Sequence, residues 1–125
     1  HTATVLNFVA ANGGYCKRQI PQVEKVRQAY EAKGVRFVNM AQTMRQEFSP
    51  EELTKVMNSL GSKIELAKDD DNAIGRGKFL VRGFPTLFVV GKDGVVQEVI
   101  IGARADLEET LNKQLETLTS QGSGS

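Results

Sequence analysis

The 125-residue chain has few of the residues that cross-link proteins or hold soft metals, with one cysteine and one histidine. A single cysteine, Cys16, cannot form an internal disulfide, and with His1 as the only other soft ligand it cannot build a zinc cage. The run KDDDN at residues 68–72 lacks the spaced oxygen ligands of an EF-hand loop and reads as a solvated loop before a helix. We therefore expect neither a metal nor another cofactor.

An excess of either charge is also missing. Sixteen Lys and Arg against fifteen Asp and Glu leave a formal net charge of +1. This balance gives no electrostatic reason to expect nucleic acid or an anionic membrane as a partner. No apolar run approaches the roughly 18 to 20 residues of a membrane-spanning helix.

What is present is typical of one globular domain: 40% of the residues are hydrophobic and 25% are charged. We expect the domain to span residues 1–118. Residues 119–125 read TSQGSGS and are expected to be a flexible Gly/Ser tail or a linker scar. Because a strand pattern begins almost at residue 1, we also expect that sequence upstream of the domain is missing.

The hydrophobic pattern predicts alternating strands and helices. Ile20, Val23, Val26 and Tyr30 recur at intervals of three or four residues, which is typical of an amphipathic helix. The predicted strands cover residues 3–9, 35–40, 86–90 and 95–101, and the predicted helices cover residues 16–33, 50–60, 72–80 and 107–118. The β-α-β start implies parallel neighbours, and the last two strands form an antiparallel hairpin. We predict an α/β fold: a four-stranded mixed sheet flanked by helices on both faces.

Residues 5–21, VLNFVAANGGYCKRQIP, resemble the active-site segment of the thioredoxin superfamily, and are most similar to its TlpA-like branch. That segment normally runs from a strand into Trp-Cys-x-x-Cys and a helix with a proline five residues after the second cysteine, a spacing that Cys16 and Pro21 keep. Phe84-Pro85-Thr86 resembles the loop that carries a cis-proline in this superfamily. The resemblance extends over residues 3–118 and implies the thioredoxin fold.

The chain departs from the family pattern in three ways. Gly13 stands where the family has its first cysteine, the nucleophile. Asn12 and Val9 stand where tryptophans are common, and the family's N-terminal β-hairpin is absent. Gly13-Gly14 is either a turn that needs positive φ angles or a nucleophile position emptied by mutation or natural divergence. A cysteine at position 13 would restore Cys-Gly-Tyr-Cys, so we favour the emptied site.

The resemblance implies a thioredoxin-like domain of a thiol–disulfide oxidoreductase, with protein or peptide thiols and disulfides as its partners. Dithiol exchange needs two thiols, so whether the chain is an enzyme is left open and the chain as written is expected to be inactive. The alternative is a redox-inactive thioredoxin-fold module that binds peptides or serves as a scaffold. We expect neither nucleic acid nor a metal as a partner. Other domains of a longer parent chain are further expected partners.

The resemblance also assigns the site residues. Cys16 takes the position of the resolving cysteine and Gly13 that of the missing nucleophile; Tyr15, Phe84 and Pro85 are the expected substrate-binding residues. Cys16 itself is either a relic resolving thiol or a small buried apolar residue.

Asn7 occupies the place where many thioredoxins carry a buried acid, and an amide there cannot take up a proton. The TlpA-like branch implies a periplasmic or otherwise extracytoplasmic location, with a membrane tether through a missing N-terminal segment.

Overall fold

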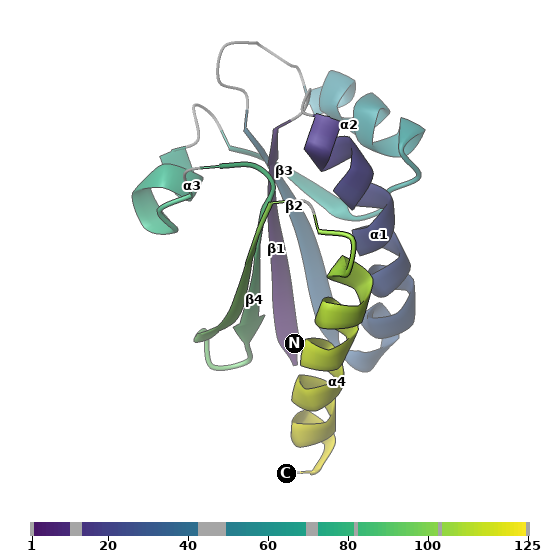
Figure 1. Ribbon diagram of the computed structural model, residues 1–125, viewed down its shortest axis with the longest axis vertical. Coiled ribbons are helices and arrows are strands. Elements are labelled where there is room, and N and C mark those ends of the chain that lie inside the picture. Colours follow the sequence, from purple (N-terminus) through teal and green to yellow (C-terminus); the bar gives the residue numbers. More distant parts are fainter. Residues whose placement is uncertain are drawn as a thin grey trace.

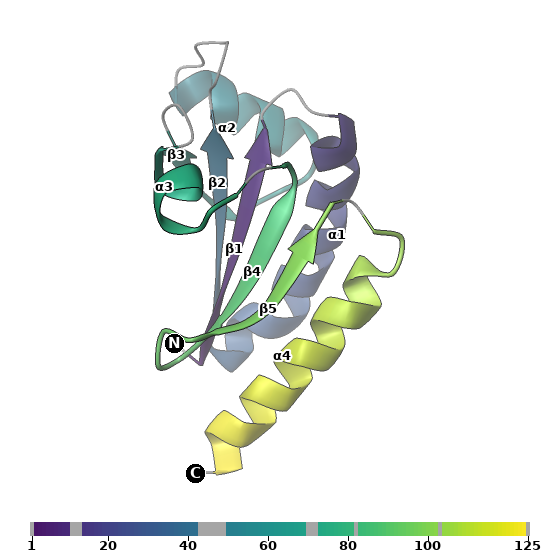
Figure 2. The ribbon, with the colours of Figure 1, turned by 60° about the vertical axis from the view of Figure 1, so that its left-hand side comes forward.

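The computed structural model describes residues 2–10, 14–42, 50–69, 73–81, 83–102 and 104–124. Within them, five strands form one mixed sheet in the order β3-β2-β1-β4-β5 (Figures 1 and 2). The strands are β1 (Ala3–Ala10), β2 (Val35–Gln42), β3 (Glu65–Asp69), β4 (Thr86–Gly91) and β5 (Val96–Ile101). The helices are α1 (Gly14–Tyr30), a short 3₁₀ helix η1 (Glu31–Lys33), α2 (Pro50–Ser59), α3 (Ala73–Lys78) and α4 (Leu107–Gly124).

The first strand lies at the centre of the sheet. β1 pairs in parallel with β2, where Val5 lies opposite Phe37, and antiparallel with β4, where Val5 lies opposite Val89. β4 and β5 form the antiparallel hairpin. The predicted mixed sheet is therefore confirmed, and the chain folds as a thioredoxin domain.

A fifth strand, β3, extends the sheet beyond the four that the sequence predicts. It pairs in parallel with β2, where Ala67 lies opposite Met40 and Lys68 opposite Ala41. Lys68 and Asp69 therefore end a strand, which corrects the prediction that a solvated loop begins at residue 68. The backbone of residues 65–69 pairs with the edge of β2, although the side chains of these five residues have little preference for a strand. Residues 70–72 lie outside the described residues.

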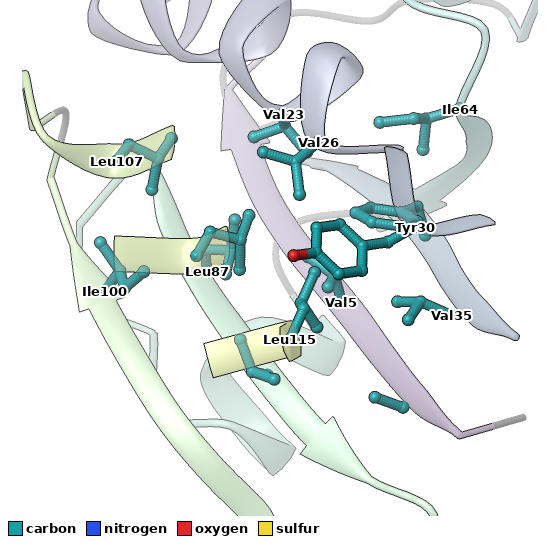
Figure 3. Close-up of a cluster of buried hydrophobic side chains, with 14 residues drawn as sticks. Val5, Val23, Val26, Tyr30, Val35, Ile64, Leu87, Ile100, Leu107 and Leu115 are labelled. Atoms are coloured by element: carbon teal, nitrogen blue, oxygen red, sulfur yellow. The ribbon is translucent and has the colours of Figure 1, made fainter. Parts of the chain in front are cut away.

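One face of the sheet is covered by α1, α2 and α4 (Figure 1). The main core cluster joins Val5 and Leu87 of the sheet to Val23 and Val26 of α1 and to the leucines of α4 (Figure 3). Leu107, Leu111 and Leu115 have no exposed surface, as their spacing along α4 predicts.

The opposite face carries α3, so the described helices flank both faces as predicted (Figure 1). Its core is aromatic: the Phe8 and Phe88 rings lie 5.7 Å apart, edge to face, and Phe79, which follows α3, packs within 5.2 Å of Phe8. Apolar side chains of the edge strand β5 are exposed, among them Val96, Val99 and Ile101, of which Ile101 is 71% exposed.

Two glycines fix the turns between elements. Gly34 ends η1 with φ +91°, and a Cβ there would lie 2.8 Å from the Thr2 hydroxyl oxygen. Gly94 has φ +83° in the β4–β5 hairpin, where its N–H donates to the Gly91 carbonyl over 3.0 Å. Only glycine takes up both the left-handed backbone and the close approach at Gly34 without strain.

The last helix runs further than the sequence predicts. α4 continues to Gly124, whereas a flexible tail is predicted from residue 119. Leu118 packs against the core and the Thr119 hydroxyl donates to the Leu115 carbonyl over 2.8 Å, so packing and hydrogen bonding both continue past residue 118. The division of the chain at residue 118 stays a prediction.

Candidate functional site

The predicted site lies where α1 begins, directly after the carboxyl end of β1. Tyr15 and Cys16 belong to the first turn of α1. Their side chains lie outside what the structure describes, as does Gly13 with its two preceding residues. The roles assigned to these three residues therefore stay predictions. The backbone places the motif at a helix N-terminus, where unpaired N–H groups favour a negative charge.

The Phe84–Pro85 loop comes directly before β4. The peptide bond between Phe84 and Pro85 is cis. Two hydrogen bonds hold the loop: the Thr86 hydroxyl donates to the Gly83 carbonyl over 2.7 Å, and the Gly102 N–H donates to the Pro85 carbonyl over 2.8 Å. Pro85 is buried and Phe84 is half-buried.

Phe84 connects this loop to α1. Its side chain packs against the buried cluster of Val9, Ile20, Ala41 and Met57. Ile20 lies one helical turn after Cys16 in α1, and Val9 is near the end of β1. The fold thus brings the Phe84–Pro85 loop to the same end of the sheet as the N-terminal half of α1.

A string of buried amides lies behind this end of α1. Gln19 Nε2 donates to Asn7 Oδ1 over 2.7 Å, Asn7 Nδ2 donates to Asn39 Oδ1 over 3.1 Å, and Asn39 Nδ2 donates to Ser62 Oγ over 3.4 Å. Each of the four residues is at most 2% exposed. At the Gln19 end, Oε1 is buried without a hydrogen-bond partner.

Sequence reasoning singled out Asn7 but missed the other three members of the string. Gln19 follows the charged Lys17 and Arg18, so locally it reads as part of a solvated helix face. Asn39 alternates with apolar residues in β2, between Val38 and Met40. An inward-facing polar residue at that position is the one signal that could have identified a buried network.

A buried carboxylate ties the middle of α1 to the segment before β3. Glu24 is 5% exposed and accepts hydrogen bonds from Arg27, from Gln28 and from the backbone N–H of Lys63. Burial by itself raises the pKa of Glu24, but these hydrogen bonds and the Arg27 charge outweigh it and lower the pKa to about 2. Glu24 is therefore ionised at neutral pH and holds α1 in place; it is not a proton donor.

A hollow of about 570 Å³ lies between the C-terminal end of α1 and α4 and is lined by Tyr30, Asn112, Lys113, Glu116 and Thr117. The Tyr30 hydroxyl is already engaged, since it donates over 3.2 Å to the Asn112 carbonyl and lies 3.1 Å from a Glu116 carboxylate oxygen. Among the described residues there is no group of three or more His, Cys, Asp or Glu that could hold a metal.

Comparison with protein-family models decides the family: the model described as Redoxin matches residues 1–115. This chain belongs to the Redoxin family. The resemblance to the thioredoxin superfamily in the motif segment is thereby confirmed over nearly the whole chain. A comparison with curated proteins finds no match. No helix within the described ranges is both long and apolar enough to cross a membrane.

Solved structures share the fold of this Redoxin domain. A Chlorobium tepidum protein described as a thiol:disulfide interchange protein DsbE superposes with a TM-score of 0.81 at 23% identity, over 94% of this chain and 80% of its own. A secreted Mycobacterium tuberculosis disulfide oxidoreductase homologous to Escherichia coli DsbE gives 0.74 at 18% identity, over 93% and 81%. StoA from Bacillus subtilis gives 0.70 at 18% identity, over 86% and 81%.

Proposed function

We propose that this Redoxin domain is a thiol–disulfide oxidoreductase domain for protein disulfides, in which the nucleophile position is emptied at Gly13. Two observations support the proposal. The Redoxin model matches residues 1–115, and Phe84 packs against the cluster that contains Ile20 of α1. The packing of Phe84 is the observation on which the assignment of the site depends, because this contact holds the predicted substrate loop against the helix that bears the motif.

The chemistry assigns one role to each motif position. With cysteine at position 13, its thiolate attacks a substrate disulfide and forms a mixed disulfide, while the departing substrate thiolate takes up a proton. The Cys16 thiolate then attacks the sulfur at position 13, which releases the second substrate thiol and leaves a 13–16 disulfide. A dithiol such as dithiothreitol reduces that disulfide for the next cycle. Gly13 has no sulfur, so the chain as written cannot begin this cycle.

Substrate binding is assigned to Tyr15, Phe84 and Pro85. An extended peptide that pairs with the backbone of the loop before β4 would lie across the start of α1. Phe84, half-buried and at this end of the sheet, offers an apolar contact to such a peptide. An extracytoplasmic location belongs to the same proposal and is supported by the structural neighbour from Mycobacterium tuberculosis, which is described as secreted.

A second candidate is a redox-inactive module that binds extended peptides at the same loop. The presence of glycine at position 13 favours it. If glycine is the natural residue there, the domain has no nucleophile, and binding of peptides is the activity that the site retains. The two candidates share the site and differ in whether position 13 once carried the reaction.

Insulin reduction by dithiothreitol tests the oxidoreductase assignment. The Gly13→Cys variant should accelerate insulin precipitation, whereas the unaltered chain and its Cys16→Ser variant should match the rate without protein. A correctly folded Gly13→Cys variant without activity would favour the peptide-binding module. Acceleration by the unaltered chain above the Cys16→Ser control would contradict the assigned role of Gly13.

A further inference from the structure

The edge strand β5 has a row of backbone groups that face away from the sheet. Among the described strands it pairs with β4 alone, and it ends the sheet (Figure 2). The Gly102 N–H donates to the Pro85 carbonyl, so this is a hydrogen-bonded position. Such positions alternate along an antiparallel strand. Ile100 therefore also faces β4, whereas Val99 and Ile101 direct their N–H and C=O groups away from it.

The same two residues carry exposed apolar side chains on one face of the sheet. Val99 lies opposite Phe88 and Ile101 lies opposite Thr86, so both side chains point to the face that carries α3. Neither is buried there. A strand edge that combines free backbone groups with apolar side chains is a template for pairing with another strand.

The opposite edge of the sheet is different. β3 carries Glu65, Lys68 and Asp69 among its five residues, and charges of this kind keep edge strands from pairing with other chains. β5 has one charged side chain, Glu98. Its carboxylate accepts a hydrogen bond from the Val99 N–H at 3.3 Å, a long contact that an incoming strand can replace. β5 is therefore the less protected of the two edges.

A second copy of β5 fits this edge in an antiparallel register about a two-fold axis at Ile100. Val99 of each copy then lies opposite Ile101 of the other copy. Because both residues have outward-facing backbone groups, the register forms a continuous ladder of N–H···O=C hydrogen bonds between the copies. It also joins valine and isoleucine side chains across the interface, and it sets Glu98 opposite Gly102, so no two carboxylates meet.

Neighbouring registers use the edge less well. With the axis at Val99, Ile101 comes opposite Gln97, whose carbonyl already accepts a hydrogen bond from Gln114 of α4 over 3.2 Å. With the axis at Glu98, two carboxylates lie directly opposite each other, which is unfavourable. The edge thus complements itself in one register, and self-complementary two-fold pairs are the commonest oligomers. This favours a second copy of the chain over an unrelated strand as the occupant.

We propose that the β5 edge is a dimerisation surface, at which two copies of the chain join their sheets through Val99 and Ile101. The interface adjoins the predicted substrate loop, because the next residue, Gly102, binds the Pro85 carbonyl. A strand of six residues gives a small interface, so we expect a weak, transient dimer with a dissociation constant of about 0.01 to 1 mM. The proposal does not depend on the chemistry at position 13.

Sedimentation of the unaltered chain at concentrations from about 0.01 to 1 mM should show a monomer–dimer equilibrium. Dithiothreitol keeps Cys16 reduced, so a disulfide between copies cannot account for the dimer. Ile101→Lys should weaken dimerisation at least about tenfold, because it puts a charge on the pairing edge. Leu80→Lys is the matched control: Leu80 is 72% exposed, against 71% for Ile101, but follows α3 and lies outside β5.

The control variant should dimerise as the unaltered chain does. Equal weakening in the two variants would show unspecific association through exposed apolar side chains and would overturn the proposal. An unaltered chain that stays monomeric at about 1 mM would overturn it as well, and would leave the edge to an unrelated partner.

A pair of opposite charges tests the register. Val99→Lys and Ile101→Glu should each weaken dimerisation when introduced alone. In the double variant each new ammonium group faces a new carboxylate of the other copy, so dimerisation should recover. With the axis at Val99 the ammonium groups would face each other, and the double variant would stay monomeric. That result would contradict the proposal.

Amide hydrogen exchange of the unaltered chain gives a second measurement that needs no variant. The N–H groups of Val99 and Ile101 should exchange several-fold more slowly in a concentrated sample than in a dilute one. The Ile100 N–H faces β4 and should be protected in both samples. Exchange at Val99 and Ile101 that does not depend on concentration would contradict the proposed interface.

Discussion

Glu24 of α1 accepts a hydrogen bond over 2.9 Å from the backbone N–H of Lys63, 39 residues later in the chain. Arg27 binds the same carboxylate through Nε and Nη2, the latter at 2.7 Å. The bond fixes the segment before β3 against the helix that carries the motif. Ser62, the adjacent residue, is the far end of the amide string, so this contact also holds the string in place.

Glu24→Gln should destabilise the fold by about 2 to 3 kcal/mol, because it removes the buried carboxylate and leaves the half-buried Arg27 with only the exposed Glu31 as a charged partner. The free energy of unfolding by urea measures this loss. The matched control is Glu31→Gln: Glu31 also binds Arg27, over 2.9 Å, but its carboxylate is 60% exposed. Exposed ion pairs contribute little, so the control should lose less than about 1 kcal/mol. Equal losses in the two variants would show that burial of Glu24 does not matter.

The dependence of stability on pH should carry the signature of Glu24. Its pKa is about 2 in the folded chain against an ordinary value of 4.5, so the carboxylate stabilises the fold fully above about pH 4.5. This contribution, roughly 3 kcal/mol by linkage, is lost as the pH falls from 4.5 toward 2. Unfolding free energies measured from pH 6 to pH 2 should fall less steeply for Glu24→Gln than for the unaltered chain. Parallel curves would contradict the lowered pKa.

Phe84→Ala in the Gly13→Cys background should lower kcat/KM for insulin reduction about tenfold, equivalent to roughly 1.4 kcal/mol. The reason is the loss of an apolar contact beside α1 where the peptide is proposed to lie. Phe79→Ala serves as the control, because Phe79 packs on Phe8 and Phe88, at 5.2 and 5.0 Å, and has no proposed role in binding peptide. Both variants should lose stability. A fall in kcat/KM of the same size in the two would remove Phe84 from the substrate site.

The sequence predicts the parts of the fold that local patterns determine. The apolar spacing of Val23, Val26 and Tyr30 identifies the buried face of α1, and Gly91 and Gly94 identify the hairpin turn. β3 was missed because its five residues include Glu65, Lys68 and Asp69, and only pairing with the edge of β2 makes them a strand. That pairing is a tertiary contact, which no short window of sequence contains.

In the candidate site, too, some residues are recognisable from the sequence and others only from the folded chain. Cys16, Pro21 and Phe84-Pro85-Thr86 are recognisable because the family keeps them at fixed spacings. The amide string is not recognisable, since Gln19, Asn39 and Ser62 come from three separate segments and meet only in the folded chain. Buried polar groups find their hydrogen-bond partners only when these segments come together in the folded chain. The sequence alone shows only that the polar Asn39 interrupts an apolar strand.

The central claim is that Gly13 occupies an emptied nucleophile position within bonding reach of Cys16. Counting free thiols in the Gly13→Cys variant tests it most directly. After mild oxidation and removal of the oxidant, the denatured monomer should contain no free thiol, and dithiothreitol should restore two. Two free thiols after oxidation, or disulfide-linked dimers in place of the oxidised monomer, would contradict the claim.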